Sequence, residues 1–493
     1  MSDRGRIAYL AGNDVLCDAR VLKYMSTAEQ LGFDVVAIGV TRHGPGRELM
    51  VGRSRVIVVG TATTMRDRIV NKWRQVHVVL RWSYRDDDEL RAARGQLARW
   101  QSTADGKKGW RRLVLAGLAR GGRLWVAARG RHRSAAGAAS APDGGDDHER
   151  AARIAALMRD PRSHWTKVLP VMRRDEAAIG PLLDSLQPDV VHVHDVFLLG
   201  VGAEAVARAR AGGRPVRLVY DAHEYVRGLA YVPPRTVAGY AGLEREYIGR
   251  ADAVVTVSEP LADLLARDHE LARRPTVVLN APAVAEPLPG APTLRGVTGV
   301  PEDAPLLVYG GGVNTARGVD TAVRALVDLP GTHLAVVTNR VNYVVRALLE
   351  LADDLGVADR VHLADYVEPQ DVPHYFSDAT VGLSTLLHSP NHDVALTNKF
   401  CEYLQAGLPI ITSDTPAQAD LVRELGLGAV YPAGDAEALA SAVRAVLADG
   451  SRLRARIADD ADLRYRFSWP AQVDVLRSFY AELSEASGEG RDR

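Results

Sequence analysis

The chain has 493 residues, more than one hydrophobic core usually organises, so at least two domains are expected. Hydrophobic residues at 47% and charged residues at 25% are typical of a soluble globular protein. The only two cysteines, Cys17 and Cys401, exclude a disulfide framework and a cysteine-rich metal site. No apolar run has the length of a signal peptide core or a charge-free membrane span, so a cytoplasmic protein without a transmembrane anchor is expected.

Charge is distributed unevenly along the chain. The formal net charge is zero, with 61 Lys/Arg and 61 Asp/Glu, but residues 66–133 contain 18 Lys/Arg against 6 Asp/Glu. The same segment contains five of the seven tryptophans: Trp73, Trp82, Trp100, Trp110 and Trp125. Basic side chains interleaved with tryptophan suit peripheral contact with anionic lipid, here at the inner face of the plasma membrane. A helical subdomain with inward-packed tryptophans explains the pattern equally, and no nucleic-acid-binding motif accompanies it.

The first sixty residues alternate short apolar runs with an amphipathic segment. Residues 6–12, 33–40 and 54–60 are predicted as strands, and residues 18–32 as a helix. This order predicts a parallel sheet with helices on both faces. An Arg/Trp-rich, helix-leaning insertion at about 66–165 then interrupts the alternation.

The alternation resumes after the insertion and forms two series separated by a Pro/Gly-rich linker at 282–305. A final amphipathic helix is predicted at 467–486. The further predicted strands are 188–195, 216–224, 251–259, 274–282, 306–312, 333–339, 360–366, 379–386, 408–414 and 428–434. Two α/β domains are therefore expected.

A glycine-rich turn follows the first strand of the second series. Gly310, Gly311 and Gly312 stand between that strand and a predicted helix, with Arg317 at the helix entrance. Such a turn lets the backbone approach a phosphate, which the helix N-terminus and an arginine would also favour. A tight turn beside an exposed arginine is the alternative. The chain contains no P-loop motif, and its first strand lacks the dinucleotide-binding glycine pattern.

A second candidate segment is "TNKFCEYLQAGLP", predicted as a helix that Thr397 or Asn398 caps and Gly407 ends. Lys399 lies in its first turn, where anions are favoured, and Glu402 lies one turn further on. A carboxylate at this place could accept both hydroxyls of a ribose. The alternative is a surface Lys–Glu pair, worth only tenths of a kcal/mol.

Polar residues also follow the strands of the first half, where an open parallel sheet binds its ligands. They are Asp14, Asp18, His194, Asp195, Asp221, His223 and Glu224. Asp14 and Asp18 are candidates for acceptor contacts, although Asp18 could equally cap the helix at Ala19. His223 and Glu224 either position a substrate or brace their loop.

Together these segments resemble family 4 retaining glycosyltransferases, which have the GT-B fold of two Rossmann-like domains facing across a cleft. The resemblance rests on "HVHD", "YDAHEYV", "VYGGGVNTARGVDTAV" and "NKFCEYLQAGLPIITSD", among other segments in the same order. It implies an acceptor-side domain at 1–285 and a nucleotide-sugar-binding domain at 300–465. A C-terminal helix at 466–487 would return toward the first domain.

The resemblance also implies roles for individual residues. Glu402 would hold the ribose of the nucleotide, Arg317 would neutralise the leaving diphosphate, and His194 would face the donor sugar. Asn398, Lys399 and the turn of Gly310, Gly311 and Gly312 would complete the donor site.

Two departures from the family pattern bear on these roles. Val394 stands where the family often has a second Glu that contacts the sugar, and Asn391, His392, Asp393 or a backbone group would have to replace it. Gly312 stands where an Arg is frequent, which leaves more of the phosphate neutralisation to Arg317.

The implied reaction moves a glycosyl group from a nucleoside diphosphate sugar to an acceptor hydroxyl with retention of configuration, without a cofactor or metal. Cell-envelope polysaccharide, glycolipid or natural-product biosynthesis would suit such a hexosyltransferase. The acidic run at 86–89 lies in the polar insertion and is expected to be a solvated face. The alternatives are a sugar-nucleotide 2-epimerase of similar fold and a catalytically degenerate nucleotide-sugar-binding protein.

Overall fold

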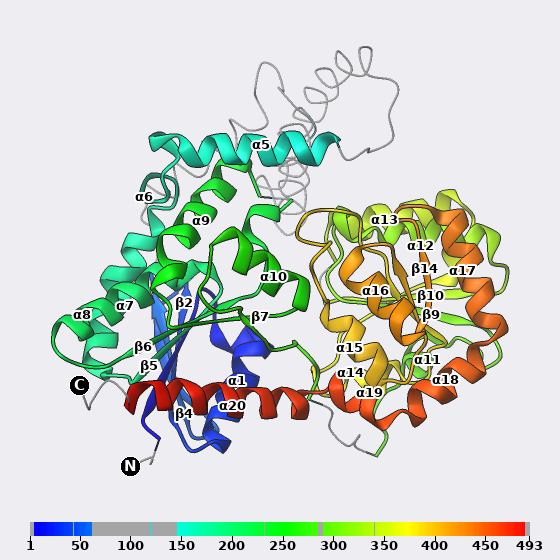
Figure 1. The fold of residues 1–493 in the computed structure, drawn as a ribbon. Coiled ribbons are helices and arrows are strands. Elements are labelled where there is room, and N and C mark those ends of the chain that lie inside the picture. The colour runs from blue at the N-terminus through cyan, green and yellow to red at the C-terminus, as the bar shows by residue number, and fades with distance from the viewer. Residues whose placement is uncertain are drawn as a thin grey trace, which may run out of the picture.

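The computed structural model of the chain describes residues 4–42, 44–61, 120, 145–230, 232–283, 289–339 and 341–488. They form two α/β lobes, which lie beside one another in Figure 1. Apart from Arg120, the basic segment 66–133 lies outside the described residues, as do its five tryptophans and the acidic run. Among the helices that are described, none combines the length and the apolar character needed to cross a membrane.

The N-terminal lobe contains an eight-stranded sheet of order β3-β4-β2-β1-β5-β6-β7-β8. Its strands are β1 (Arg6–Ala11), β2 (Asp34–Thr41), β3 (Arg47–Val51), β4 (Ser54–Gly60), β5 (Val190–His194), β6 (Arg217–Ala222), β7 (Ala253–Thr256) and β8 (Thr276–Val277). All neighbours pair in parallel except β3, an antiparallel edge strand that was not among the predicted strands. A two-residue turn joins β3 to β4, and its Gly52 has a φ of 60°, as tight hairpins require.

Helices cover both faces of this sheet, and the chain supplies an apolar stripe for each. In α1 (Ala19–Gln30), buried residues recur at Val21, Tyr24, Met25 and Ala28, the spacing of one helical face. The helices on the opposite face pack against the second core of the lobe. The remaining helices of the lobe are α5 (Gly145–Arg159), α6 (Trp165–Val168), α7 (Val171–Leu186), α8 (Leu199–Ala211), α9 (Pro234–Tyr247) and α10 (Glu259–Asp268).

The C-terminal lobe contains a fully parallel sheet of order β11-β10-β9-β12-β13-β14. Its strands are β9 (Leu306–Gly310), β10 (His333–Val337), β11 (Val361–Ala364), β12 (Val381–Ser384), β13 (Ile410–Ser413) and β14 (Gly428–Tyr431). Its helices are α11 (Leu294–Thr298), α12 (Val319–Ala325), α13 (Tyr343–Asp354), α14 (Val372–Phe376), α15 (Asn398–Gln405), α16 (Pro416–Leu425), α17 (Ala436–Ala448), α18 (Gly450–Asp459) and α19 (Ala461–Arg466). The short helix α11 lies within the segment predicted as a linker, and its Leu294 is buried in the core of this lobe.

The last helix, α20 (Trp469–Gly488), leaves the C-terminal lobe and lies along the N-terminal one (Figure 1). Trp469 Nε1 donates to Thr27 Oγ1 at 3.1 Å, and Tyr480 is buried in the core that α1 shares with the sheet. The hydroxyl of Tyr480 lies 2.9 Å from His192 Nδ1. Helix α20 therefore packs against β5 at His192, two residues before the polar end of that strand at His194.

Candidate active site

The glycine-rich turn after β9 opens the candidate site in the C-terminal lobe. Gly311 has a φ of 122°, a conformation that side chains disfavour, and a Cβ placed there would lie 3.8 Å from Lys399 Cε. The hydroxyl of Tyr309 donates to the carbonyl oxygen of Gly312 at 2.9 Å and fixes the turn. Arg317 ends the 3-10 turn that follows, and its charge acts on Lys399.

Lys399 and Arg317 form a pair of cations without a carboxylate partner among the described residues. Lys399 is 5% exposed, and its Nζ lies 4.2 Å from the centroid of the Tyr309 ring. Burial lowers the pKa of Lys399 well below its usual value, the charge of Arg317 lowers it further, and Glu402 opposes both. Two like charges held together in this way favour an anion between them.

The start of α15 adds backbone donors to this site. Thr397 precedes the helix, but its side chain makes no capping hydrogen bond and contacts Gln418 Oε1 at 3.0 Å instead. Asn398, the other predicted cap, is the first helical residue and is exposed. The N–H groups of this turn thus lack a side-chain cap, which suits an anionic ligand.

Glu402 is one turn along α15 and is 8% exposed. Among the described residues, its side-chain hydrogen-bond contacts come from the Tyr366 hydroxyl alone, at 3.4 and 3.5 Å from the two carboxylate oxygens. Burial raises the pKa of Glu402 to about 7, against the charges of Lys399 and Lys23. A buried carboxylate with such weak partners has unused acceptor capacity. The alternative of a surface Lys–Glu pair is therefore not what the structure shows, because both Lys399 and Glu402 are buried.

The segment before α15 contacts the N-terminal lobe. Val394 packs against the core of that lobe, and its carbonyl oxygen accepts from Ser258 Oγ at 2.5 Å. Asn391 Oδ1 accepts from the Tyr225 N–H at 2.8 Å. The position where the resembled family often has a sugar-binding Glu is thus used here for contact between the lobes.

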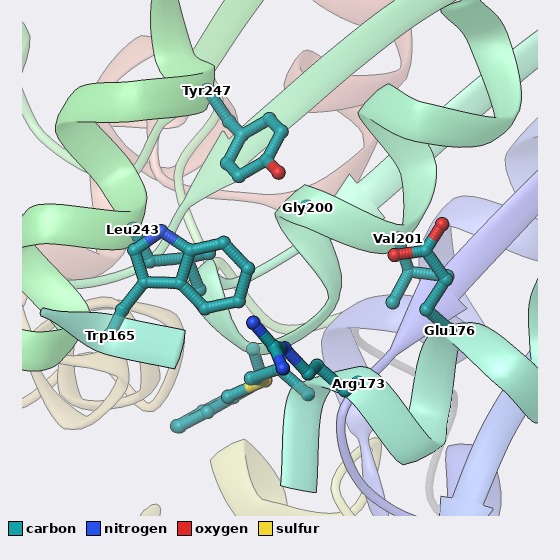
Figure 2. Close-up of a pocket in the computed structure, with 9 residues that line it drawn as sticks. Trp165, Arg173, Glu176, Gly200, Val201, Leu243 and Tyr247 are labelled. Carbon is teal, nitrogen blue, oxygen red and sulfur yellow. The ribbon is translucent and has the colours of Figure 1, made fainter. Parts of the chain in front are cut away.

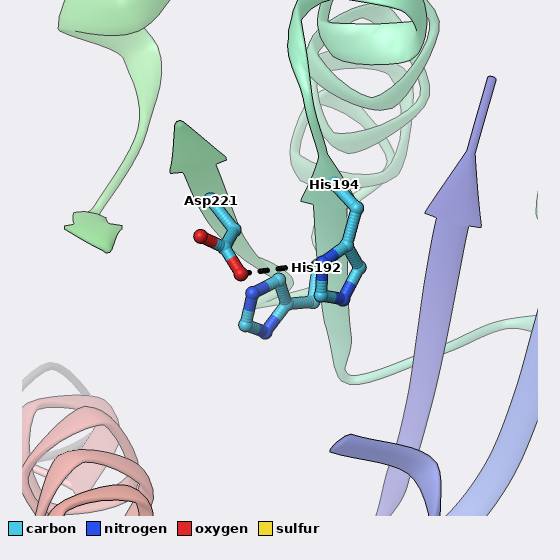
Figure 3. A group of neighbouring side chains, drawn as sticks. All are labelled: His192, His194 and Asp221. Atoms are coloured by element: carbon cyan, nitrogen blue, oxygen red, sulfur yellow. Dashed lines mark ion pairs between the residues drawn. The ribbon is translucent and has the colours of Figure 1, made fainter. Parts of the chain in front are cut away.

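A buried polar cluster lies at the ends of β5 and β6 in the N-terminal lobe (Figure 3). His194 Nδ1 lies 3.2 Å from Asp221 Oδ2 and 3.3 Å from His223 Nε2. Arg20 holds Asp221 through both carboxylate oxygens at 2.9 Å. Burial raises the pKa of Asp221, but Arg20 and the imidazoles outweigh it and hold that pKa well below its usual range.

His194 and His223 differ in their exposure. His194 is 1% exposed, packs against Tyr9 and Tyr24, and its Nε2 has no hydrogen-bond partner among the described residues. The His223 side chain is 19% exposed. Although burial lowers the pKa of His223, Asp221 raises it above its ordinary value. His223, rather than His194, is the imidazole of this cluster that reaches solvent.

The predicted acidic residues of this lobe differ in the contacts that they make. Asp18 caps α1 by accepting from the N–H groups of Arg20 and Val21, while its other oxygen accepts from Asn13 at 3.0 Å. Burial raises the pKa of Asp18, but the Asn13 hydrogen bond and then His194 lower it overall. Asp14 forms an ion pair with Arg47.

Two further acidic residues lie beside the imidazoles. Asp195 adopts a φ of 65° and accepts from the Val196 N–H at 2.8 Å. The exposed Glu224 is within the electrostatic influence of Arg317, which belongs to the other lobe. The acceptor-side and donor-side candidates are thus brought toward one another by the two sheets.

Two other features do not join this site. His192, His194 and Asp221 place three ligand-type atoms within 4.8 Å of one another, but both oxygens of Asp221 are occupied by Arg20, whose charge opposes a cation there. Figure 2 shows a hollow between α6, α7, α8 and α9. It is lined by Trp165, Met172, Arg173, Glu176, Phe197, Gly200, Val201, Leu243 and Tyr247, none of them a predicted site residue.

Comparison with family models gives two matches in the order of the lobes. Residues 110–281 match the model described as Glycosyltransferase Family 4, and residues 304–449 match the one described as Glycosyl transferases group 1. Among curated relatives, a D-inositol 3-phosphate glycosyltransferase of Xylanimonas cellulosilytica is 28% identical over 313 residues, covering 60% of this chain and 72% of that one.

Solved structures share the two-lobed fold. A sucrose-phosphate synthase from Thermosynechococcus elongatus superposes with a TM-score of 0.63 at 14% identity, over 98% of this chain and 100% of its own. An Anabaena protein, Alr3699/HepE, solved in complex with UDP-glucose superposes with a TM-score of 0.51 at 18% identity, over 65% and 83% of the two chains.

Proposed function

Because the chain belongs to the family 4 glycosyltransferases of GT-B fold, we propose that it transfers a sugar from a nucleoside diphosphate sugar to an acceptor hydroxyl with retention of configuration. The donor assignment rests on one observation in the C-terminal lobe. Arg317 and Lys399 have no carboxylate partner among the residues described, and the buried carboxylate of Glu402 has acceptor capacity to spare. A diphosphate matches the first and a ribose diol the second. The Anabaena protein solved with UDP-glucose is consistent with this donor class.

In the proposed complex the diphosphate lies between Arg317, Lys399 and the N–H groups at the start of α15, beside the turn of Gly310, Gly311 and Gly312. Glu402, one turn further along, accepts the ribose hydroxyls, and Asn398 borders the nucleotide. Negative charge grows on the departing β-phosphate as the glycosidic bond breaks. The fixed cations then stabilise the transition state more than the bound donor, which is what lowers the barrier.

The same cations perform the task for which other transferases use a divalent metal, so we propose that the reaction proceeds without one. In a retaining reaction the acceptor attacks on the face that the diphosphate leaves, and a phosphate oxygen takes the acceptor proton. Undiminished turnover in the presence of a chelator is the expected result. Loss of turnover that Mg²⁺ or Mn²⁺ restores would contradict the metal-free proposal.

The acceptor is proposed to bind at the ends of β1, β5 and β6. His223 is the imidazole that reaches solvent there, and Asp18, Asp195 and Glu224 surround it with carboxylates. These groups accept hydrogen bonds from hydroxyls and repel a phosphate. We therefore propose an acceptor that presents sugar or polyol hydroxyls to this surface. His194 acts in this scheme through His223 and Asp221, behind the reacting groups.

The basic, tryptophan-rich segment 66–133 supports a further proposal, that the enzyme contacts the inner face of the plasma membrane and receives a membrane-associated acceptor, as in cell-envelope or glycolipid assembly. Binding to anionic liposomes that is lost at high salt, or on charge reversal of this segment, is expected. A wild-type protein that does not bind the anionic liposomes would contradict this proposal.

Incubation with UDP, GDP, ADP and dTDP sugars, followed by separation of the products, tests the proposed function. Release of the nucleoside diphosphate with slow hydrolysis or transfer of the sugar is expected, and NMR of a transferred product would show the donor's anomeric configuration. A changed sugar still attached to its nucleotide would indicate epimerisation. Binding without turnover would indicate a degenerate binding protein.

A further inference from the structure

We propose that His392 contacts the donor sugar and helps to determine which sugar is accepted, by accepting a hydrogen bond from a sugar hydroxyl at Nε2. The inference rests on the proposed function, since it assumes a nucleoside diphosphate sugar beside Arg317. It concerns the segment that contains Val394, a residue that packs against the N-terminal lobe.

The position of His392 follows from a short series of hydrogen bonds. Its Nδ1 lies 2.8 Å from the carbonyl oxygen of Leu387, and the Leu387 N–H donates to the carbonyl oxygen of Ala316 at 2.9 Å. The imidazole is therefore held beside the turn that carries Arg317. The charges of Arg317 and Lys399 both act on the ring, so both cations lie in its neighbourhood.

The contact to Leu387 also fixes which ring nitrogen carries the proton. A carbonyl oxygen can only accept, so Nδ1 must donate, and Nε2 of the neutral ring keeps its lone pair. Burial lowers the pKa of His392 to about 4, with Arg317 and Lys399 adding to the effect and the Leu387 carbonyl opposing it. The ring is thus neutral at pH 7, and Nε2 has no hydrogen-bond partner among the described residues.

The neighbouring side chains have part of their polar atoms engaged elsewhere. The Asn391 side chain accepts from Tyr225, and Asp393 Oδ1 lies 2.8 Å from His388 Nδ1. Val394 is apolar and packs against the N-terminal lobe, where its carbonyl is also bonded. His392 is distinguished in this segment because the charges of Arg317 and Lys399 act on it, whereas Asp393 is influenced by His388 and Asp414.

A neutral acceptor has a chemical advantage at this place. The donor sugar is attached to the β-phosphate, so a group bordering the phosphate site is within reach of the first sugar. A carboxylate there would compete with the phosphate for Arg317 and Lys399, whereas a neutral imidazole leaves their charge for the diphosphate. The proposed contact requires a sugar with a hydroxyl in reach of Nε2 and disfavours a sugar deoxygenated there.

The experiment compares binding of a nucleoside diphosphate with binding of the corresponding sugar nucleotide. Calorimetry on wild type first selects, from the UDP, GDP, ADP and dTDP series, the pair that binds most tightly. His392→Phe keeps a ring without an acceptor, His392→Gln restores an acceptor oxygen, and His388→Gln changes the same loop at a residue that faces Asp393 and Asp414.

His392→Phe is expected to weaken the sugar nucleotide by about 3- to 10-fold, the effect of one neutral hydrogen bond, and to leave the free nucleoside diphosphate within about twofold of wild type. His392→Gln should recover most of the loss. His388→Gln should change the affinities for both ligands by the same factor or leave both unaltered.

Equal weakening of both ligands by His392→Phe would overturn the inference, because it would give the ring a structural or phosphate-binding role. Unchanged affinity for both would overturn it as well. If His392→Phe does not fold, the His392→Gln protein is tested with monodeoxy sugar nucleotides, and a pattern of losses identical to that of wild type would count against the contact. Failure of wild type to bind any of the four series would instead reject the proposed function, and this inference with it.

Discussion

The ammonium of Lys399 lies 4.2 Å above the ring of Tyr309, and no described carboxylate pairs with it. A buried lysine that depends on an aromatic face, next to a second cation, is unfavourable in the empty protein. The phosphate of a bound donor would relieve this cost. The site thus favours a negative charge that the described part of the chain does not place beside Lys399.

Replacing this lysine should change stability and activity in opposite directions. Lys399→Met keeps the length of the side chain and removes the charge, so the free energy of unfolding should rise by about 1 kcal/mol while turnover falls at least 10-fold. Thermal unfolding and donor turnover measure the two effects. Lys167→Met, at an exposed position of α6, is the matched control and should alter neither. A less stable Lys399→Met protein would contradict the proposed cost.

The pKa of Glu402 predicts an acid limb for donor binding. A carboxyl group with a pKa of about 7 gains its proton as pH falls through 7, and it then loses acceptor capacity toward the ribose. The affinity for a sugar nucleotide, which has no titrating phosphate in this range, should therefore fall below pH 7. Glu402→Gln should bind weakly and without this limb.

The raised pKa of Glu402 also makes the free energy of unfolding depend on pH. Between the usual carboxyl pKa of about 4.3 and 7 the folded protein binds more protons at Glu402 than the unfolded chain does. The contribution of this group to the free energy of unfolding therefore decreases as pH rises through that window. Glu402→Gln should be more stable than wild type at pH 8 and should lose this advantage near pH 4.

The Arg20–Asp221 ion pair should be a major support of the acceptor side. Both side chains are almost fully buried, at 3% and 0% exposure. Arg20→Met leaves the Asp221 charge without its main partner and should lower stability by about 3–5 kcal/mol, whereas adding Asp221→Leu should recover much of the loss. Thermal unfolding of the two variants measures this. A double variant less stable than Arg20→Met would contradict the account.

His223 should affect transfer without affecting the nucleotide. His223→Phe removes the solvent-reaching imidazole near the proposed acceptor, so transfer should fall by about 10- to 100-fold while affinity for the free nucleoside diphosphate stays unchanged. Kinetics of transfer and calorimetry of the nucleotide separate these readouts. The opposite pattern, with nucleotide affinity lost and transfer kept, would contradict the placement of His223 on the acceptor side.

Sequence patterns were sufficient to predict the fold and to select candidate residues for the donor side. The apolar runs marked the strands of both sheets, and polar residues gather beyond the ends of parallel strands, so the glycine turn, Arg317 and Glu402 could be selected before their distances were known. The family match and the two-lobed fold confirm the expected glycosyltransferase class. The short edge strand β3, with its mixed and partly exposed side chains, lacked such a signal.

Other features depended on packing that residue spacing does not contain. His192 and His194 share a face of β5, where His192 contacts Tyr480 of α20, nearly three hundred residues later. His194 packs against Tyr9 and Tyr24, and residue spacing does not contain this packing. The direction of Val394 depends on how the two lobes meet. His392 was one of several open alternatives in the sequence, and the proposal to select it depends on contacts that spacing does not reveal.

The central claim, that one site holds both the diphosphate and the ribose of a sugar nucleotide, is tested most directly by calorimetry of Glu402→Ala with the best-binding sugar nucleotide. Removal of two hydrogen bonds to a charged group should weaken binding by at least about 10- to 100-fold, while the melting temperature stays the same or rises. An affinity equal to that of wild type, in a folded variant, would contradict the account.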